Sequence, residues 1–125
     1  MADRHMLTPS SDHPITIAPN PARVIVRVGE RVVADTRNAL TLREASYPAV
    51  QYIPREDADP ALLRRSDHSS YCPYKGEASY FDLEPLGPRG ANAIWNYEAP
   101  YPAAERIAGH LAFYPDRVTV EEQIE

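Results

Sequence analysis

The residue types best suited to chemistry in this chain gather in two short segments. The first, residues 66–76 (SDHSSYCPYKG), holds the chain's single cysteine, Cys72, three residues before Lys75 and four after His68. A nearby ammonium or imidazolium stabilises thiolate over thiol, which raises the reactivity of a cysteine at neutral pH. The spacing therefore predicts a Cys72 nucleophile activated by Lys75, with His68 or His110 as acid or base. The structural alternative is a small buried thiol beside a turn, with Lys75 reaching solvent.

The second segment, residues 95–102 (WNYEAPYP), combines aromatic rings with one carboxylate. Trp95, Tyr97 and Tyr101 offer large rigid surfaces with polar tips, a mixture typical of small-molecule pockets. Glu98 beside them could accept a hydrogen bond from a ligand or act as a general base. In the alternative interpretation, Trp95 and Tyr97 share one strand face in the core and Glu98 is a solvated strand end.

A metal site would need ligands from distant parts of the chain. His68, Cys72 and His110 could supply the three ligands of an open zinc site. The sequence has no CxxC pair and no HExxH motif, so we expect no metal. His5 and His13 lie in a polar N-terminal stretch and are expected to be solvated.

Composition excludes several classes of protein. Thirteen prolines in 125 residues rule out an all-helical bundle, because each proline removes a backbone donor and fixes φ. The net charge of −5 argues against a nucleic-acid module, which normally carries a basic face. No apolar run is long enough for a membrane span, and residues 1–14 lack the apolar core of a signal peptide. With a single cysteine no internal disulfide can form, and we expect a cytoplasmic location.

Apolar and polar residues alternate in the first half of the chain, as is typical of β-strands. Residues 1–13 are predicted to be a flexible tail, followed by a single domain over 14–125. Strands are expected at 23–28 and 31–35, joined by a type II′ turn at Gly29-Glu30. Further strands at 40–43 and 50–53 complete a predicted β-meander.

The second half is predicted to mix short strands with short helices. Asp59 suits an N-cap for a helix over 60–65 with Pro60 in its first position, and Gly109 would close two helical turns over 102–108. The segment 66–76 and the Pro/Gly-rich stretch 84–92 are read as loops. The remaining strands are expected at residues 79–83, 93–97, 111–114 and 117–120, the last two joined by a tight turn at Pro115-Asp116. These elements predict a mainly β fold, a compact antiparallel barrel or tent-like sandwich with one or two short helices.

Four long motifs carry a resemblance to a known family. They are YIPRED (52–57), DHSSYCPYKGEASYF (67–81), WNYEAPYPA (95–103) and GHLAFYPDRV (109–118). In these motifs and their spacing the chain resembles the family catalogued as domain of unknown function 427, over residues 13–120. The resemblance implies a compact, mainly β domain with a tent-like or barrel arrangement. The family is sometimes labelled nucleotidyltransferase-like, but the phosphate-gripping elements that such chemistry needs are absent from this sequence.

The convergence of aromatic and charged residues in the two segments predicts a small-molecule-binding domain with an unknown cofactor requirement. The expected ligand-binding residues are Tyr52, Arg55, Tyr71, Lys75, Trp95, Glu98, Tyr101 and His110. Arg55 or Lys75 would suit an anionic ligand. The alternatives are the Cys72 enzyme and an interaction domain that docks a partner on its tyrosine-rich surface. A homodimer formed by pairing sheet edges is a further expectation.

Overall fold

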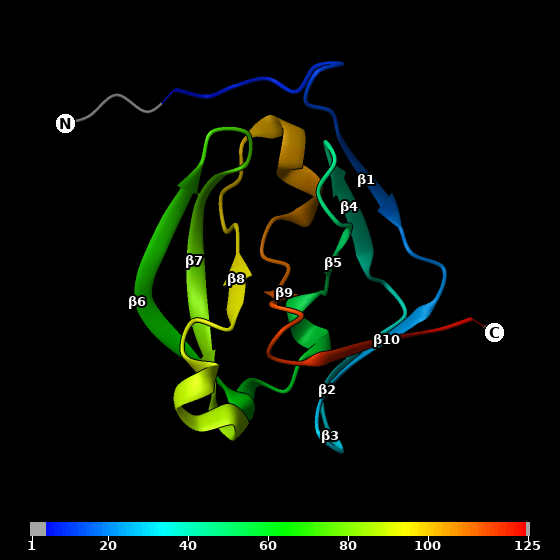
Figure 1. The fold of residues 1–125 in the computed structure, drawn as a ribbon, viewed down its shortest axis with the longest axis vertical. Helices are drawn as coiled ribbons and strands as arrows, with labels where there is room; N and C mark the ends of the chain where they lie inside the picture. Colours follow the sequence, from blue (N-terminus) through cyan, green and yellow to red (C-terminus); the bar gives the residue numbers. More distant parts are fainter. Residues whose placement is uncertain (1–4, 125) are drawn as a thin grey trace.

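The computed structural model describes residues 5–124, so residues 1–4 of the predicted tail and Glu125 of the predicted domain lie outside it. Its strands are antiparallel and form three sheets that face one another (Figure 1). The first sheet has the order β1 (Ile15–Pro19), β4 (Leu40–Glu44), β5 (Val50–Tyr52). The second has the order β10 (Thr119–Gln123), β2 (Arg23–Val28), β3 (Arg31–Thr36). The third has the order β6 (Leu63–Cys72), β7 (Gly76–Leu83), β8 (Ile94–Asn96), β9 (Ala112–Phe113). Across the described residues they form a sandwich-like arrangement and not a closed barrel, which confirms the mainly β prediction.

The helical segments are short 3-10 helices. They are η1 (Arg55–Asp57), η2 (Pro60–Leu62), η3 (Glu84–Gly90) and η4 (Pro102–Ile107). The Asp59 carboxylate caps η2 by accepting a hydrogen bond from the Ala61 backbone, as predicted. The predicted helix over 60–65 is wrong beyond Leu62, because β6 begins at Leu63. Gly109, with φ of +72°, follows η4 in the left-handed conformation expected there.

The β2–β3 hairpin confirms the strongest local prediction. Gly29 has φ of +59° and Glu30 does not share the positive φ, as a type II′ turn requires. The two strands pair from Val28↔Arg31 to Val24↔Thr36, with one register shift after Val26.

Longer-range strand pairing differs from the sequence-based prediction. The meander is wrong because the chain leaves the sheet after β3, and β4 pairs with β1 and β5. The predicted hairpin of the last two strands is also wrong, since β10 crosses to pair with β2. There Glu121 accepts a hydrogen bond from Arg27 at 2.8 Å. An ion pair between residues so distant in sequence leaves no local pattern.

The prediction of a loop over 66–76 is wrong, because most of this segment is strand. Ser69↔Ser79 and Cys72↔Gly76 are partners in the β6–β7 hairpin, and only 73–75 form its turn. β6 lies at the edge of its sheet and its central side chains are exposed. An exposed edge strand needs no apolar alternation, so the sequence carried no strand signal here.

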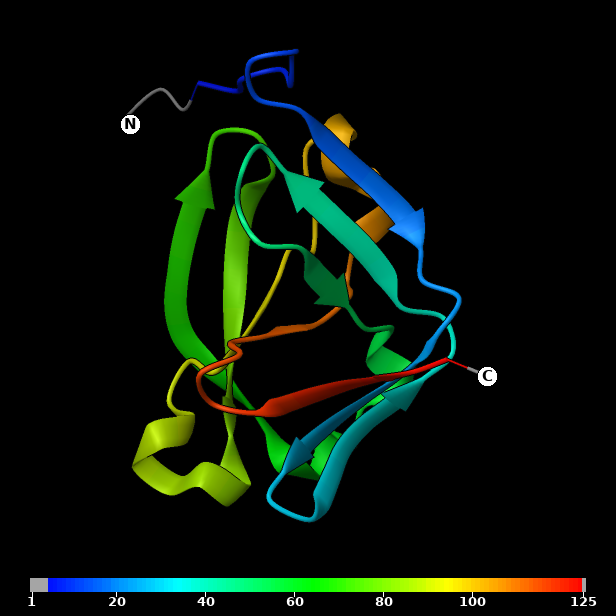
Figure 2. The same cartoon turned by 45° about the vertical axis from the view of Figure 1, so that its right-hand side comes forward.

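The buried side chains form two separate clusters. β7 contributes to both, because successive side chains of a strand point to opposite faces. Ala78 and Tyr80 belong to one cluster, together with residues of β4, β5 and η4. Phe81 and Leu83 belong to the other, together with residues of β2 and β3. The turned view in Figure 2 shows β2, β3 and β10 below the β1–β4–β5 sheet, in keeping with this division.

Candidate functional site

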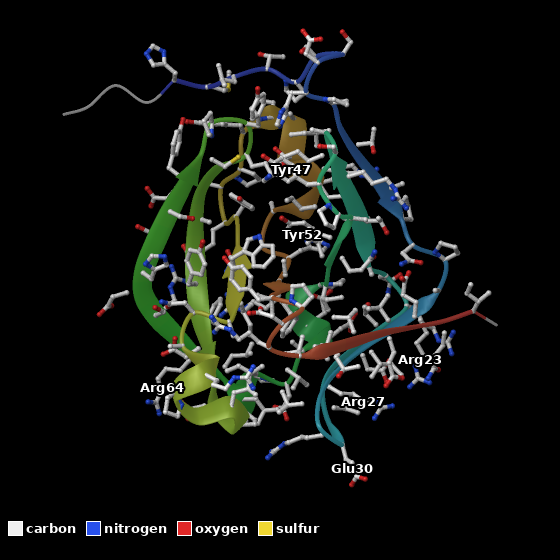
Figure 3. All side chains as sticks on the ribbon, in the orientation of Figure 1. Arg23, Arg27, Glu30, Tyr47, Tyr52 and Arg64 are labelled. Carbon is white, nitrogen blue, oxygen red and sulfur yellow. The ribbon has the colours of Figure 1, made fainter. Side chains whose placement is uncertain are left out.

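A cavity of about 190 Å³ lies beside the second cluster, between the β4–β5 edge and the faces of β7 and β8. Tyrosine rings make up much of its wall. Its lining residues are Leu42, Glu44, Tyr47, Pro48, Val50, Tyr52, Lys75, Tyr80, Trp95, Tyr97 and Tyr114. Figure 3 shows Tyr47 and Tyr52 in the space between these sheets, whereas Arg23, Arg27 and Arg64 lie at the lower periphery.

A buried ion pair lies in the wall of this cavity. Glu44 ends β4, and its Oε1 accepts a hydrogen bond from the Nζ of Lys75, which ends the β6–β7 turn. Their side chains are only 12% and 10% exposed. Glu44 Oε2 is 2.7 Å from Nε2 of His13, whose ring stacks on Tyr74 at a centroid distance of 3.9 Å. Burial alone would raise the pKa of Glu44, but the hydrogen bonds to Lys75 and His13 outweigh it and lower that pKa below 4.5.

The phenols of Tyr52, Tyr97 and Tyr114 are neutral at physiological pH. Burial raises the pKa of Tyr52 and of Tyr97 far above 10, and raises that of Tyr114 to about 12. The hydroxyl of Tyr52 accepts a hydrogen bond from Trp95 Nε1 at 3.2 Å, so its own proton remains available. Lys75 Nζ lies 5.8 Å from the centre of the Tyr97 ring. Among the described residues the Tyr97 hydroxyl has no hydrogen-bond partner.

The polar groups of the cavity are therefore mainly donors. Both oxygens of Glu44 already have cationic or imidazole partners. Lys75 has three N–H groups and gives one to Glu44. With the phenolic protons of Tyr52 and Tyr97, the cavity presents an ammonium and hydroxyl donors. Such a set is complementary to an oxygen acceptor, and best to an anionic one.

Of the residues predicted from sequence to bind a ligand, Tyr52, Lys75 and Trp95 line this cavity. Tyr71 and Tyr101 do not line it, and their hydroxyls lie 2.7 Å apart. The Tyr101 backbone N–H donates to the Lys75 carbonyl at 3.0 Å, which fixes this tyrosine pair beside the turn that carries Lys75.

The other predicted binding residues lie elsewhere. Arg55 and His110 line a separate, open cavity of about 450 Å³. Glu98 pairs with Arg65 at 2.6 Å on the surface, where both side chains are about half exposed. The hydrogen bond from Arg65 lowers the pKa of Glu98, which disfavours a role as general base at neutral pH.

The predicted catalytic residues are only partly brought together. His68 and Cys72 both lie in β6, where four extended residues span roughly 13 Å, too far for direct proton transfer. The exposed His68 ring packs against Tyr80 at 4.5 Å, and Cys72 is half-buried against the second cluster. Within residues 5–124, no three His, Cys, Asp or Glu side chains converge to hold a metal ion. The nucleophilic role of Cys72 stays a prediction.

Sequence reasoning missed Glu44 and misplaced His13, the two partners that complete the polar cluster around Lys75. The expectation that His13 is solvated is wrong, since it contacts both Glu44 and Tyr74. One signal was available in the composition: Lys75 is the only lysine among 13 cationic residues. The other Lys/Arg positions are all arginine, and the single lysine is buried.

Fold and site together define a small antiparallel β domain organised around an aromatic cavity with a buried cation. The family described as Domain of unknown function (DUF427) matches residues 16–124, and the chain belongs to this family. None of the curated proteins matches the chain significantly. Throughout residues 5–124, every helix is too short to cross a membrane.

Proposed function

We propose that this protein is a small-molecule-binding domain that receives a carboxylate or similar oxygen anion in the tyrosine-lined cavity. The observation that carries the proposal is the burial of the only lysine, paired with Glu44, in the wall of that cavity. Tyr52 and Tyr97 would add neutral hydroxyl donors to the same ligand group.

Energetics support a binding role for this ion pair. Removing two charges from water costs several kcal/mol per ion, and a hydrophobic replacement of similar volume is often at least as stable. The pair therefore adds little that an apolar core would not supply. Charged groups held in a concave site with perturbed pKa values are typical of functional sites.

The size of the cavity limits the bound group. Drug-sized ligands occupy pockets of about 300–1,000 Å³, whereas this cavity measures about 190 Å³. It suits one compact polar group and a few attached carbon atoms. The donor set selects an anionic or neutral acceptor over a cation, because Lys75 would repel an ammonium.

Trp95, the only tryptophan, lines the cavity and makes its fluorescence a specific reporter of binding. We would titrate the protein with benzoate, benzamide and benzylamine, which share a ring and differ in charge. Benzoate is expected to bind most tightly and benzylamine most weakly. Lys75→Met should weaken benzoate by about tenfold or more, because a hydrogen bond to a charged group contributes about 1.5–3 kcal/mol.

Arg64→Met is the matched control, since it removes a cation from β6 whose side chain is 71% exposed. It should leave benzoate affinity unchanged. Equal binding of the three ligands, or equal affinity of Lys75→Met and the unaltered protein, would contradict the proposal. Circular dichroism of each variant separates loss of binding from loss of fold.

The other sequence-based expectations stay predictions. No contact among the described residues favours the Cys72 enzyme, the partner-docking surface or the homodimer over the binding role. A cytoplasmic location belongs to the proposal because a lone thiol suits a reducing compartment.

A further inference from the structure

A second, larger hollow adjoins the tyrosine-lined cavity. This outer groove has a volume of about 460 Å³ and shares Tyr47, Pro48, Val50 and Trp95 with the cavity. Its remaining lining residues are Ala49, Gln51, Phe113, Pro115, Val120 and Glu122. Because four residues line both spaces, a ligand bound in the cavity lies next to the groove.

The walls of the outer groove are mainly apolar, and one oxygen each of Gln51 and Glu122 already accepts hydrogen bonds. Gln51 Oε1 accepts hydrogen bonds from Asn20 at 3.0 Å and from Thr41 at 2.9 Å. Glu122 Oε1 accepts from the same Asn20 amide at 2.7 Å. No lysine or arginine lines the groove. It therefore offers contact area to hydrocarbon and no cation for a second anionic group.

The boundary between the two spaces is formed by Trp95 on β8 and by the connection between β4 and β5. The Trp95 indole is held by its hydrogen bond to Tyr52 and by the Tyr114 ring, 4.5 Å away. Residues 45–49 connect β4 to β5, and the backbone N–H of Ala45 donates a hydrogen bond to the Pro14 carbonyl at 2.8 Å. Tyr47 in this connection is 66% exposed. Tyr47, Pro48, Val50 and Trp95 line both spaces, so the cavity and the groove meet at this boundary.

We infer that the ligand class is an amphiphilic monocarboxylate, with its carboxylate beside Lys75 and an apolar tail in the outer groove. This inference rests on the proposed function and adds the tail. The cavity alone recognises the head group, and the groove supplies the larger share of apolar contact.

The test is a series of straight-chain carboxylates from butanoate to decanoate, each kept below its aggregation concentration and followed by Trp95 fluorescence. Transfer of each methylene from water into an apolar site is expected to lower Kd about fourfold until the groove is filled. Alcohols of the same lengths test the head group separately, and should bind more weakly at every length.

Two matched variants locate the tail. Val120, 38% exposed on β10, lines the groove, whereas Val32, 41% exposed on β3 of the same sheet, does not. Val120→Asp should flatten the dependence of Kd on chain length, because a carboxylate then replaces an apolar contact of the tail. Val32→Asp should preserve the fourfold step. The slope is the readout, since a uniform electrostatic effect on the head group leaves it unchanged.

The outcomes separate the inference from the proposed function. Carboxylates that bind in a Lys75-dependent manner without chain-length dependence would overturn the tail and leave the head-group site in place. Equal slopes in Val120→Asp and Val32→Asp would place the tail elsewhere and overturn the inference as well. Absence of carboxylate binding, or equal binding of acids and alcohols, would overturn the proposed function and the inference with it.

Discussion

The two buried clusters of this domain differ in chemistry although they share the strands of one sheet. The first contains aliphatic side chains and both phenylalanines of the chain, Phe81 and Phe113, and no tyrosine. The second contains Tyr52, Tyr80 and Tyr97. A single residue step along β7, from Tyr80 to Phe81, separates a phenol from a plain phenyl ring.

The difference assigns separate roles to the two faces of the sheet. The first cluster gains stability from apolar burial with no polar atom to satisfy. The second places hydroxyls, a cation and a carboxylate next to a cavity, where each buried polar group costs free energy unless it is paired. We infer that stability is concentrated in the first cluster and ligand recognition in the second.

The largest expected effect is on the first cluster. Leu83 is fully buried there, and Leu83→Ala should lower the free energy of unfolding by about 2–5 kcal/mol, because the cavity it leaves adds to the lost burial. Urea denaturation measures the loss. Benzoate affinity of the folded fraction should be unchanged. A loss of ligand affinity comparable to that of Lys75→Met would break the division of roles.

An intermediate effect on stability is expected from adding a hydroxyl to the first cluster, compared with removing one from the second. Val24→Thr adds a hydroxyl to the first cluster, and should cost about 1–3 kcal/mol of unfolding free energy because the group has no ready partner. Tyr97→Phe removes an unpartnered hydroxyl from the second cluster, and should change stability by less than about 0.5 kcal/mol. It should nevertheless weaken benzoate. Similar stability losses in both variants would contradict the comparison.

The smallest effect is a dependence on pH that only the second cluster should show. The folded-state pKa of Glu44 lies below its ordinary value of 4.5. The unfolded chain therefore binds more protons in that window, and the stabilisation is present above pH 4.5 and lost as the pH falls through the folded pKa. The difference in unfolding free energy between the unaltered protein and Glu44→Gln should shrink as the pH falls below 4.5.

Leu83→Ala serves as the reference for that experiment. Its cost arises from apolar packing, so it should not vary over the same pH range. The lowered pKa values of Asp35 and Glu98 contribute equally to the protein and its Glu44→Gln variant and cancel in the difference. A constant difference down to pH 3 would show that Glu44 is not stabilised in its charged form.

The fold was predictable where neighbouring residues determine it. The alternation of Val24 and Val26 and the glycine at position 29 were enough for the β2–β3 hairpin. β6 was not predicted because the side chains of an exposed edge strand need not alternate between apolar and polar. The pairing of β10 with β2 was not predicted because it depends on contacts between residues far apart in the sequence, such as Arg27 with Glu121.

The residue types of the candidate site could be predicted from the sequence, but the contacts between its side chains could not. Lys75 and Trp95 stood out because they lie in unusual local segments. Glu44 lies 31 residues from both Lys75 and His13. Only the pairing of β1 with β4 and the packing of that sheet against the β6–β7 hairpin bring the three side chains together. Local spacing paired Lys75 with Cys72 and His68, but the extended conformation of β6 separates the histidine from the thiol.

The solitary, buried position of Lys75 also makes this domain unusual as a substrate for proteases. An endoproteinase that cleaves only after lysine has one target bond in the chain, Lys75–Gly76, within the β6–β7 hairpin. Gly76 is buried, and its backbone lies against that of residues 99–101. Cleavage therefore requires the hairpin to open. The rate of proteolysis then measures how often the segment that positions Lys75 opens.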